Sequence, residues 1–429
     1  MRYPPISSKL FEKNRAKVLS KLPKDSVAIV HSNDQMPRNG DLFFPYRQNS
    51  DFFYLTGIEQ EKSILLLIPG ESDKKKQAIL FILEPNPKLE IWEGKKVSFE
   101  EAQRISGITE IHYEEAFHIF FTKVVANLTK IYLNRNENPR LQTNVRSRDD
   151  RFTRILKRNF PSKDYLRLAP ILWECRLQKE PEEIELIQKA CAITRDSFYE
   201  VIKQVKPGMY EYEIEAIITN HFISKGAKGH AYEPIIAGGK NACYLHYVKN
   251  SDILQPNEVL FMDFGAEYAN YASDCSRAIP ISGKFTKRQR EVYEAVLRVL
   301  KYTRTLIVAG TTISAYHKLT CECMQQELLS LGLITKDDIA KQSIKNPAYF
   351  TYFMHGVSHF LGLDTHDVGE RDTILKPGMI VTCEPGIYIQ SEGLGIRLEN
   401  DILVTETGNI DLMGDIPIEV DEIEGLMRS

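Results

Sequence analysis

Hydrophobic residues in the first part of the chain occur in short runs that alternate with helical segments. The runs are SVAIV (26–30), SILLLI (63–68) and AILFILE (78–84), and turn-forming residues such as Pro69–Asp73 separate them. Strands interleaved with helices are typical of a compact α/β domain. The pattern therefore predicts an N-terminal α/β domain over residues 1–172.

The pattern changes after this region. A connecting stretch, RLAPILWECRLQKEPEE, leads to a helix start at Pro181, and the two glutamates behind this proline suit the positive end of a helix dipole. Apolar residues from Ile184 to Phe198 then follow at nearly helical spacing. We therefore expect a long helix with one buried face.

Residues 173–429 show a loose internal duplication in their layout. Helical stretches at 181–204 and 210–226 precede strands that end in one pair of acidic residues. Two more, at 286–308 and 312–332, precede strands that carry a second pair. The sequence thus predicts a C-terminal α+β domain with a pseudo-twofold arrangement.

The two pairs of acids are the most informative residues of the chain. Asp263 and Asp274 form the first pair, Glu384 and Glu399 the second, and all four lie in stretches that otherwise resemble buried strands. A bare carboxylate in an apolar strand is costly unless a cation neutralises it. Together with His359, the four acids form the donor set expected for a pair of divalent metals with two bridging carboxylates. Such a pair is typical of a hydrolase.

Hairpins can bring these acids together. The segment between Asp263 and Asp274, FGAEYANYAS, has room for a hairpin around Glu267–Asn270, and a glycine-containing connection separates Glu384 from Glu399. Side chains opposite each other on an antiparallel pair lie about 5 Å apart. Two facing hairpins would therefore bring all four acids to one point.

Composition narrows the class of protein without identifying it. The chain has 429 residues, 43% hydrophobic content and a net charge of −3, and its pI is near 6.4. This balance gives no reason to expect nucleic acid or an acidic membrane as a partner. No apolar run is long enough to span a bilayer, and the N-terminus resembles a short amphipathic helix more than a signal peptide. Seven cysteines, an odd number without the spacing of a disulfide framework, suit a reducing compartment, so we expect a cytoplasmic protein.

The order of these residues is similar to that of a known family, the pita-bread metallopeptidases. Within it the chain resembles the Xaa-Pro aminopeptidases (aminopeptidase P) and, next, the prolidases. The N-terminal segments that carry the resemblance are PYRQNSDFFYLTG (45–57) and EIWEG (90–94). The C-terminal ones are NACYLHY (241–247), FMHGVSHFLGLDTHDVG (353–369) and LKPGMIVTCEPGIYI (375–389).

The resemblance implies a role for each metal ligand. It implies that Asp263 binds one metal, that Asp274 and Glu399 bridge, and that His359 and Glu384 bind the other. Four oxygen donors and one imidazole favour Mn²⁺, with Co²⁺, Zn²⁺ or Fe²⁺ as substitutes. In such a site a water held between the metals supplies hydroxide, and the family assigns its second proton to Glu384.

The resemblance also implies roles for residues around the metals. His246, His355 and His366 are candidates for substrate contact and oxyanion support. Arg397 either orients a bridging carboxylate, relays a proton or forms a structural ion pair, and Tyr388 is expected to line the pocket.

Trp92 lies in the N-terminal domain, in the position of an aromatic residue that closes the pocket of a neighbouring subunit in the family. The alternative is an ordinary packing tryptophan. The trans role implies a homodimer or homotetramer whose N-terminal domains contribute both to self-association and to the pocket.

Three functions remain open at this point. The first is an aminopeptidase that hydrolyses the bond between an N-terminal residue and a following proline. The second is a prolidase restricted to Xaa-Pro dipeptides, which IIAGGKN (235–241) and LHYVKN (245–250) would also suit. The third is a non-catalytic peptide-binding relative, which the complete ligand set disfavours.

Overall fold

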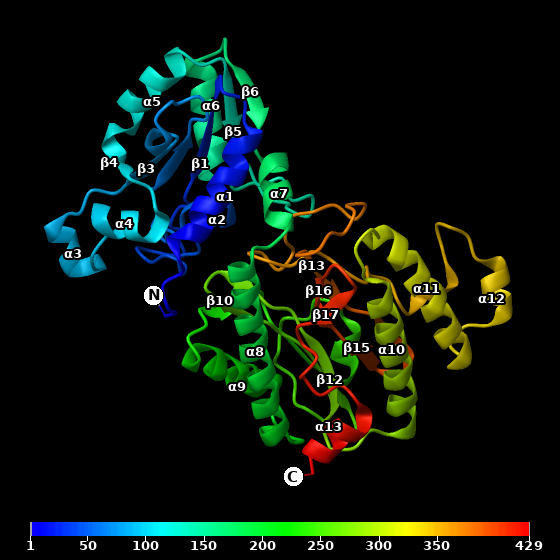
Figure 1. Ribbon diagram of the computed structural model, residues 1–429. Helices are drawn as coiled ribbons and strands as arrows, with labels where there is room; N and C mark the ends of the chain where they lie inside the picture. The colour runs from blue at the N-terminus through cyan, green and yellow to red at the C-terminus, as the bar shows by residue number, and fades with distance from the viewer. Residues whose placement is uncertain (1, 429) are drawn as a thin grey trace. The chain divides into compact units, whose positions relative to one another are not determined.

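The computed structural model describes residues 2–428, which divide into two compact units. One comprises Pro4–Arg176, and the other comprises Leu177 onwards together with the first residues of the chain. Both units mix helices and strands, as predicted (Figure 1). None of the helices within residues 2–428 has the length and hydropathy that crossing a bilayer requires.

The N-terminal unit is built on a six-stranded mixed sheet with the order β4-β3-β2-β1-β5-β6. Its strands are β1 (Ser26–His31), β2 (Ile64–Leu67), β3 (Ala78–Ile82), β4 (Glu110–Tyr113), β5 (Lys130–Leu133) and β6 (Asp164–Arg167). The central strand β1 pairs antiparallel with β2 and parallel with β5. The three predicted apolar runs are thus β1, β2 and β3.

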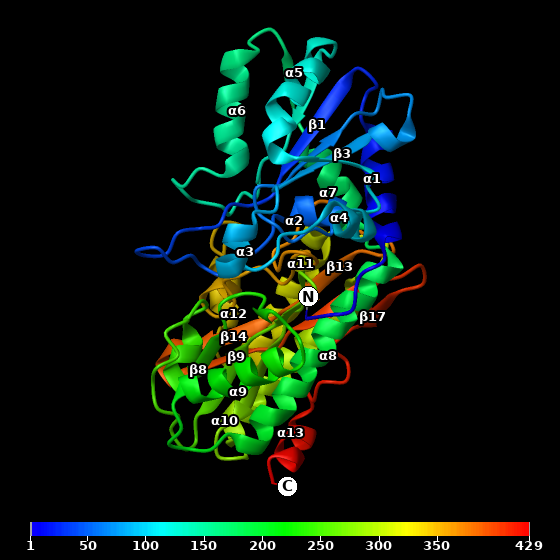
Figure 2. The ribbon, with the colours of Figure 1, turned by 90° about the vertical axis from the view of Figure 1, so that its left-hand side faces the viewer.

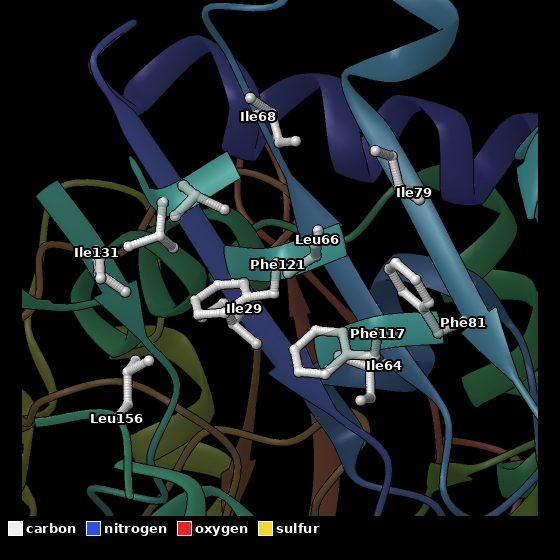
Figure 3. Packing of buried hydrophobic residues seen from close by; sticks show 12 residues of the cluster. Ile29, Ile64, Leu66, Ile68, Ile79, Phe81, Phe117, Phe121, Ile131 and Leu156 are labelled. Atoms are coloured by element: carbon white, nitrogen blue, oxygen red, sulfur yellow. The ribbon is translucent and has the colours of Figure 1, made fainter. Parts of the chain in front are cut away.

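Helices cover both faces of this sheet, α5 and α6 on one side and α1 on the other (Figure 2). The helices of the unit are α1 (Ser8–Lys21), α2 (Ser50–Thr56), α3 (Pro87–Glu93), α4 (Phe99–Ser106), α5 (Phe117–Ala126), α6 (Arg148–Asn159) and α7 (Ala169–Leu177). Phe117 and Phe121 of α5 pack on alternate residues of the strands, among them Ile29, Leu66 and Phe81 (Figure 3). Helices also cover the opposite face of the sheet, so each strand is buried on both faces. The runs are therefore apolar at every position.

One segment differs from the expectation. The stretch predicted as a connection before Pro181 contains helix α7, which begins next to Pro170 and buries Leu172 and Cys175. Proline in the first turn hides the helix from a pattern search, yet it lacks only an N–H that a helix start leaves unbonded.

The C-terminal unit repeats one arrangement of two helices followed by strands. The first half contains α8 (Pro181–Gln204), α9 (Glu211–Ser224), β7 (Gly229–His230), β8 (Ile235–Gly238), β9 (Val259–Asp263), β10 (Ala266–Tyr268), β11 (Tyr271–Ala272) and β12 (Ser276–Pro280). The second half contains α10 (Lys287–Leu306), α11 (Ile313–Ser330), α12 (Lys336–Lys341), β13 (Ile380–Cys383), β14 (Gly386–Ile389), β15 (Leu394–Arg397), β16 (Asn400–Val404), β17 (Asn409–Asp411) and α13 (Val420–Leu426). The predicted helices thus correspond to α8, α9, α10 and α11.

The strands lie between the two helix pairs, with α8 and α9 against the first-half strands and α10 against the second-half strands (Figure 1). They form the sheets β12-β9-β8, β11-β10-β7, β13-β16-β17 and β14-β15. Strand β15 contacts β9 and β12, so the two halves meet where their acidic residues lie. The predicted hairpin is present as β10 and β11, which turn at Ala269 and Asn270, both with positive φ.

Candidate metal centre and active site

Strand register brings three of the predicted ligands to one place. Asp263 ends β9 and is the register partner of Ser276 in β12, two residues after Asp274. Glu399 follows β15, and its N–H donates to the carbonyl of Ser276 over 3.1 Å. The first acid pair and the last acid therefore converge on Ser276, whose hydroxyl donates to Oε2 of Glu399 over 2.8 Å.

An irregular segment adds the histidine. Residues 357–361 run beside β13, where the N–H of Thr382 donates to the carbonyl of His359 over 2.9 Å and the N–H of Glu384 donates to that of Val357 over 2.9 Å. His359 lies on no helix. Its Nε2 lies 3.3 Å from Oδ2 of Asp274 and 3.7 Å from Oε1 of Glu384.

The donor atoms suit a metal. One ligand atom each from Asp274, His359 and Glu399 lies within 4.8 Å of the others. Nδ1 of His359 lies 3.0 Å from the carbonyl of Phe360, to which it can donate, so Nε2 faces the carboxylates and would bind a metal after losing its proton. Asp263 and Glu384 extend the same cluster, through Asp274 and Tyr232 on one side and through His359 on the other.

The charges of the cluster fit divalent cations. Burial raises the pKa of Asp263 and of Glu399, and the neighbouring carboxylates raise both further. Burial alone would lower the pKa of His359, but its contact with Asp274 and the charge of Glu384 raise it to about 9. Arg397 brings one positive charge to four carboxylates. The excess negative charge is what one or two dications would neutralise.

A hydrogen-bonded chain lies next to the acids. Arg397 donates to Asp263, to Oγ of Ser276 over 3.0 Å and to the hydroxyl of Tyr388 over 2.9 Å. That hydroxyl lies 2.9 Å from Nε2 of His355, whose Nδ1 lies 2.8 Å from the carbonyl of Gly356. Burial, and next the charge of Arg397, lower the pKa of His355 to about 3. Neutral His355 therefore donates to Gly356 and accepts from Tyr388.

The remaining predicted residues lie at different depths. The ring of His366 is 4.5 Å from that of His359 and almost perpendicular to it. His246 is exposed on a loop, and it makes a small electrostatic contribution to the lowered pKa of His355. Trp92 belongs to α3 of the N-terminal unit, and 85% of its surface is exposed.

Two residues of the site were not predicted from the sequence. The hydroxyl of Tyr232 lies 2.5 Å from Oδ1 of Asp263 and 2.6 Å from Oδ1 of Asp274. Asp401 is fully buried, and its Oδ2 accepts from the N–H of Asp274 over 3.0 Å. Asp401 carried a detectable signal, an acid inside an apolar strand two residues after Glu399. Tyr232 carried none, because its position depends on how the segment before β8 folds back on β9.

The fold and the acidic centre define a metallopeptidase. Residues 185–406 match the family model of metallopeptidase family M24, and residues 11–132 match that of the aminopeptidase P N-terminal domain. The chain belongs to family M24 and is a hydrolase with the pita-bread fold.

Known proteins are similar to this chain over almost their full length. The Xaa-Pro aminopeptidase of Haemophilus influenzae is 36% identical over 97% of both chains. That of Escherichia coli K12 is 33% identical over 98% of both chains. The structure of aminopeptidase P from E. coli with the inhibitor Pro-Leu has a TM-score of 0.90, with 32% identity and 99% of each chain covered.

Proposed function

We propose that this protein is a metallo-aminopeptidase that releases an N-terminal residue from peptides with proline at the second position. The observation that carries the proposal is the cluster of four carboxylates, three of them buried, with His359 within an M24 domain. The similarity to Xaa-Pro aminopeptidases over almost the whole chain supports this substrate class.

The proposed cofactor is a pair of divalent cations, with Mn²⁺ favoured by four hard oxygen donors and one imidazole. The proposed ligands are Asp263, Asp274, His359, Glu384 and Glu399. When bound, the metals would activate water and polarise the scissile carbonyl. Tyr232 and Ser276 hold three of the carboxylates in position through their hydroxyl groups.

Side chains of the protein would transfer protons, contact the substrate and orient the metal ligands. Burial raises the pKa of Glu384 to about 7, which suits a general base working near neutral pH. We assign His355, His246 and His366 to substrate contact and oxyanion support. Both ring nitrogens of His355 have partners, Gly356 and Tyr388, so His355 would have to exchange one of these contacts to reach the substrate. Arg397 would orient Asp263 through their ion pair.

The chemistry of the Xaa-Pro bond explains why its cleavage needs a specialised active site. The Xaa-Pro bond is a tertiary amide without an N–H, so a protease that hydrogen-bonds this group cannot use it. A pocket for the ring beside a site for the free α-amine would restrict cleavage to one N-terminal residue. Tyr388, buried next to His355, is our candidate for the wall of that pocket.

The N-terminal unit would support self-association and complete the pocket of another subunit through Trp92. Under this proposal residues 1–172 form the association domain and residues 173–429 the catalytic domain. The protein would act on peptides in the cytoplasm and not on nucleic acids or membranes, which the net charge of −3 supports.

A prolidase is the second candidate, because IIAGGKN and LHYVKN suit it as well. A dipeptide places its carboxylate just beyond the proline ring, so a dipeptidase needs a cation there, whereas an aminopeptidase needs an open channel. The experiment is to compare kcat/KM for an Xaa-Pro dipeptide and for its extension by one residue, with Mn²⁺ added.

We expect faster cleavage of the longer peptide, and loss of activity after chelation that Mn²⁺ restores. A clear preference for the dipeptide would make the protein a prolidase. No cleavage of either peptide with metal bound would favour the non-catalytic peptide-binding relative. Anomalous scattering from metal-soaked crystals would count the ions, which we expect to lie about 3.5–4 Å apart, and a map without metal near Asp274 would refute the ligand set.

A further inference from the structure

His246 lies on a segment that regular structure does not fix. Residues 244–252, between β8 and β9, form neither helix nor strand, and His246 itself is exposed. An imidazole that meets substrate must nevertheless be held within a fraction of an ångström, because misplacement by about 1 Å can cost 100-fold in rate. Its support must therefore come from side-chain contacts of this segment.

A buried carboxylate supplies that support. Glu211, the first residue of α9, is fully buried. Its Oε1 accepts from the N–H of Gly238 over 2.8 Å and from Nδ2 of Asn241 over 2.9 Å. Its Oε2 accepts from the hydroxyl of Tyr247 over 2.7 Å and from the N–H of Asp252 over 2.9 Å. Two of the four donors precede the segment, one is its last residue, and one is the residue next to His246.

The four hydrogen bonds to Glu211 are stronger than ordinary ones because their acceptor is a buried carboxylate. A buried carboxylate without partners is costly, whereas hydrogen bonds to an ionised acceptor are about twice as strong as neutral ones. A negative charge at the first residue of a helix is also favoured by the helix dipole. Glu211 therefore gains most when all four donors are in place, which couples the two ends of the segment to each other.

A second acid, one helical turn further on, fixes the end of the segment. Oε2 of Glu215 accepts from Nδ2 of Asn250 over 2.8 Å. Buried Asn250 has a φ of +45°, and it also bonds the carbonyl of Pro234 and the N–H of Ile236 over 3.0 Å each. Since the residue between these two is the register partner of Asp263, the segment is tied to the strand that carries a proposed metal ligand.

The contact of Tyr247 is the one nearest to His246. The N–H of Tyr247 donates to the carbonyl of Tyr244 over 3.2 Å, which closes a turn around His246. The hydroxyl of the same tyrosine reaches Glu211, so the turn is held at its backbone and at its side chain. His246 is also among the residues whose electrostatic interaction lowers the pKa of His355, next to Tyr388.

We propose that Glu211, acting through Tyr247, positions His246 for the reacting peptide. The inference rests on the proposed function. Glu211 and Tyr247 are positioning residues in this scheme, since their contacts are with the loop and not with the acidic centre.

The test is a double-mutant cycle between Tyr247→Phe and His246→Ala, measured as kcat/KM on an Xaa-Pro-Yaa peptide with Mn²⁺. Tyr247→Phe removes one hydroxyl and keeps the ring. We expect a loss of about 10- to 100-fold in the parent and no further loss in the His246→Ala background. Tyr212→Phe is the matched control, because its half-exposed ring lies on α9 next to Glu211, and it should retain parental activity.

Other outcomes separate the two proposals. If Tyr247→Phe retains full activity, or reduces it equally in both backgrounds, the positioning role is wrong while the proposed function stands. A metal-loaded parent that cleaves no Xaa-Pro peptide refutes the proposed function and the role of His246 with it. The same cycle can be measured with Glu211→Gln in place of Tyr247→Phe. The melting temperatures of all variants distinguish a displaced loop from an unfolded protein.

Discussion

Glu384 shows how one residue can serve two purposes in this site. Its carboxylate lies 3.7 Å from Nε2 of His359 and 3.8 Å from Nδ1 of His355, and burial raises its pKa to about 7. A group that titrates there can take a proton and release it near neutral pH. Under the proposed function, metal ligation and proton transfer would therefore use the same carboxylate.

We predict that Glu384→Gln abolishes turnover and leaves the fold intact. The amide has the same shape, but it can neither accept a proton nor bind a metal as an anion, so kcat should fall at least 100-fold. Steady-state kinetics at saturating Mn²⁺ measure turnover, and thermal melting measures the stability of the fold. Glu406→Gln, at an exposed acid of the same unit, is the control. Activity within tenfold of the parent would mean that the base lies elsewhere.

His230 gives a prediction at acidic pH. Its Nε2 lies 2.7 Å from Oγ1 of Thr219, its ring packs against Phe222, and burial lowers its pKa to about 4. The fold therefore favours the neutral ring. The stabilisation is complete above the unfolded pKa of about 6.5 and is lost as pH falls towards 4.

We predict that the parent and the His230→Asn variant differ in how their unfolding free energy depends on pH. From pH 7 to pH 5 the parent should lose about 1–2 kcal/mol of unfolding free energy more than His230→Asn does. Urea unfolding at both pH values measures it, with His118→Asn as an exposed control. Equal losses in the parent and in His230→Asn would show that His230 titrates normally in the folded protein.

The sequence revealed some of the candidate site and concealed the rest for a physical reason. The four acids were detectable because a charge in an apolar strand contradicts its surroundings, and the structure does bring them together with His359. Tyr232 and Glu211 were not detectable. A tyrosine before a strand and a glutamate at a helix start are ordinary residues, and only tertiary packing gives them their partners.

At the scale of elements, periodicity predicted most of the fold. Strands β1, β2 and β3 and helices α8 and α10 have long or uniform patterns, and each was expected close to its observed range. Helix α7 was missed because it is short and contains a proline near its start. Sheet order was beyond prediction, since local patterns do not encode which strands become neighbours.

A buried ion pair connects two such elements. Lys179, just before α8, lies with its Nζ 3.1 Å from Oδ2 of Asp367, and both side chains are 1% exposed. Asp367 follows His366 and donates its own N–H to the carbonyl of Phe360 over 2.9 Å. A Cβ on Gly362 would lie 2.2 Å from the Asp367 carboxylate, so only glycine fits there.

We predict that Lys179→Met destabilises the protein by about 3–5 kcal/mol, because it leaves Asp367 buried and unpaired. Adding Asp367→Leu should recover much of the loss, since a well-packed apolar pair can replace a buried ion pair. Urea unfolding of the single and double variants measures both steps. If the single variant is as stable as the parent, the ion pair contributes nothing to stability.

At the scale of the whole molecule, similarity to known relatives covers both units. All five proposed metal ligands lie in the C-terminal unit, so a role for the N-terminal unit has to be sought outside the metal centre. Trp92 offers one, because it and Ile91 are 85% and 82% exposed on α3. Neighbouring large apolar side chains left in water are typical of an interaction site.

We predict that the protein self-associates and that Trp92 acts in the active site of a partner subunit. Sedimentation should show a dimer or tetramer, and Trp92→Ala should lower kcat/KM by about 10- to 100-fold without lowering the melting temperature. Leu89→Ala, at a half-exposed position of the same helix, is the control.

Mixing two impaired variants tests the trans role directly. In an oligomer reassembled from Trp92→Ala and Glu384→Gln subunits, some sites combine an intact Glu384 with an intact Trp92 from the partner. Activity should then return, whereas a tryptophan acting on its own subunit would leave every site deficient. A fully active monomer, or a mixture without recovered activity, would return Trp92 to an ordinary packing or surface role.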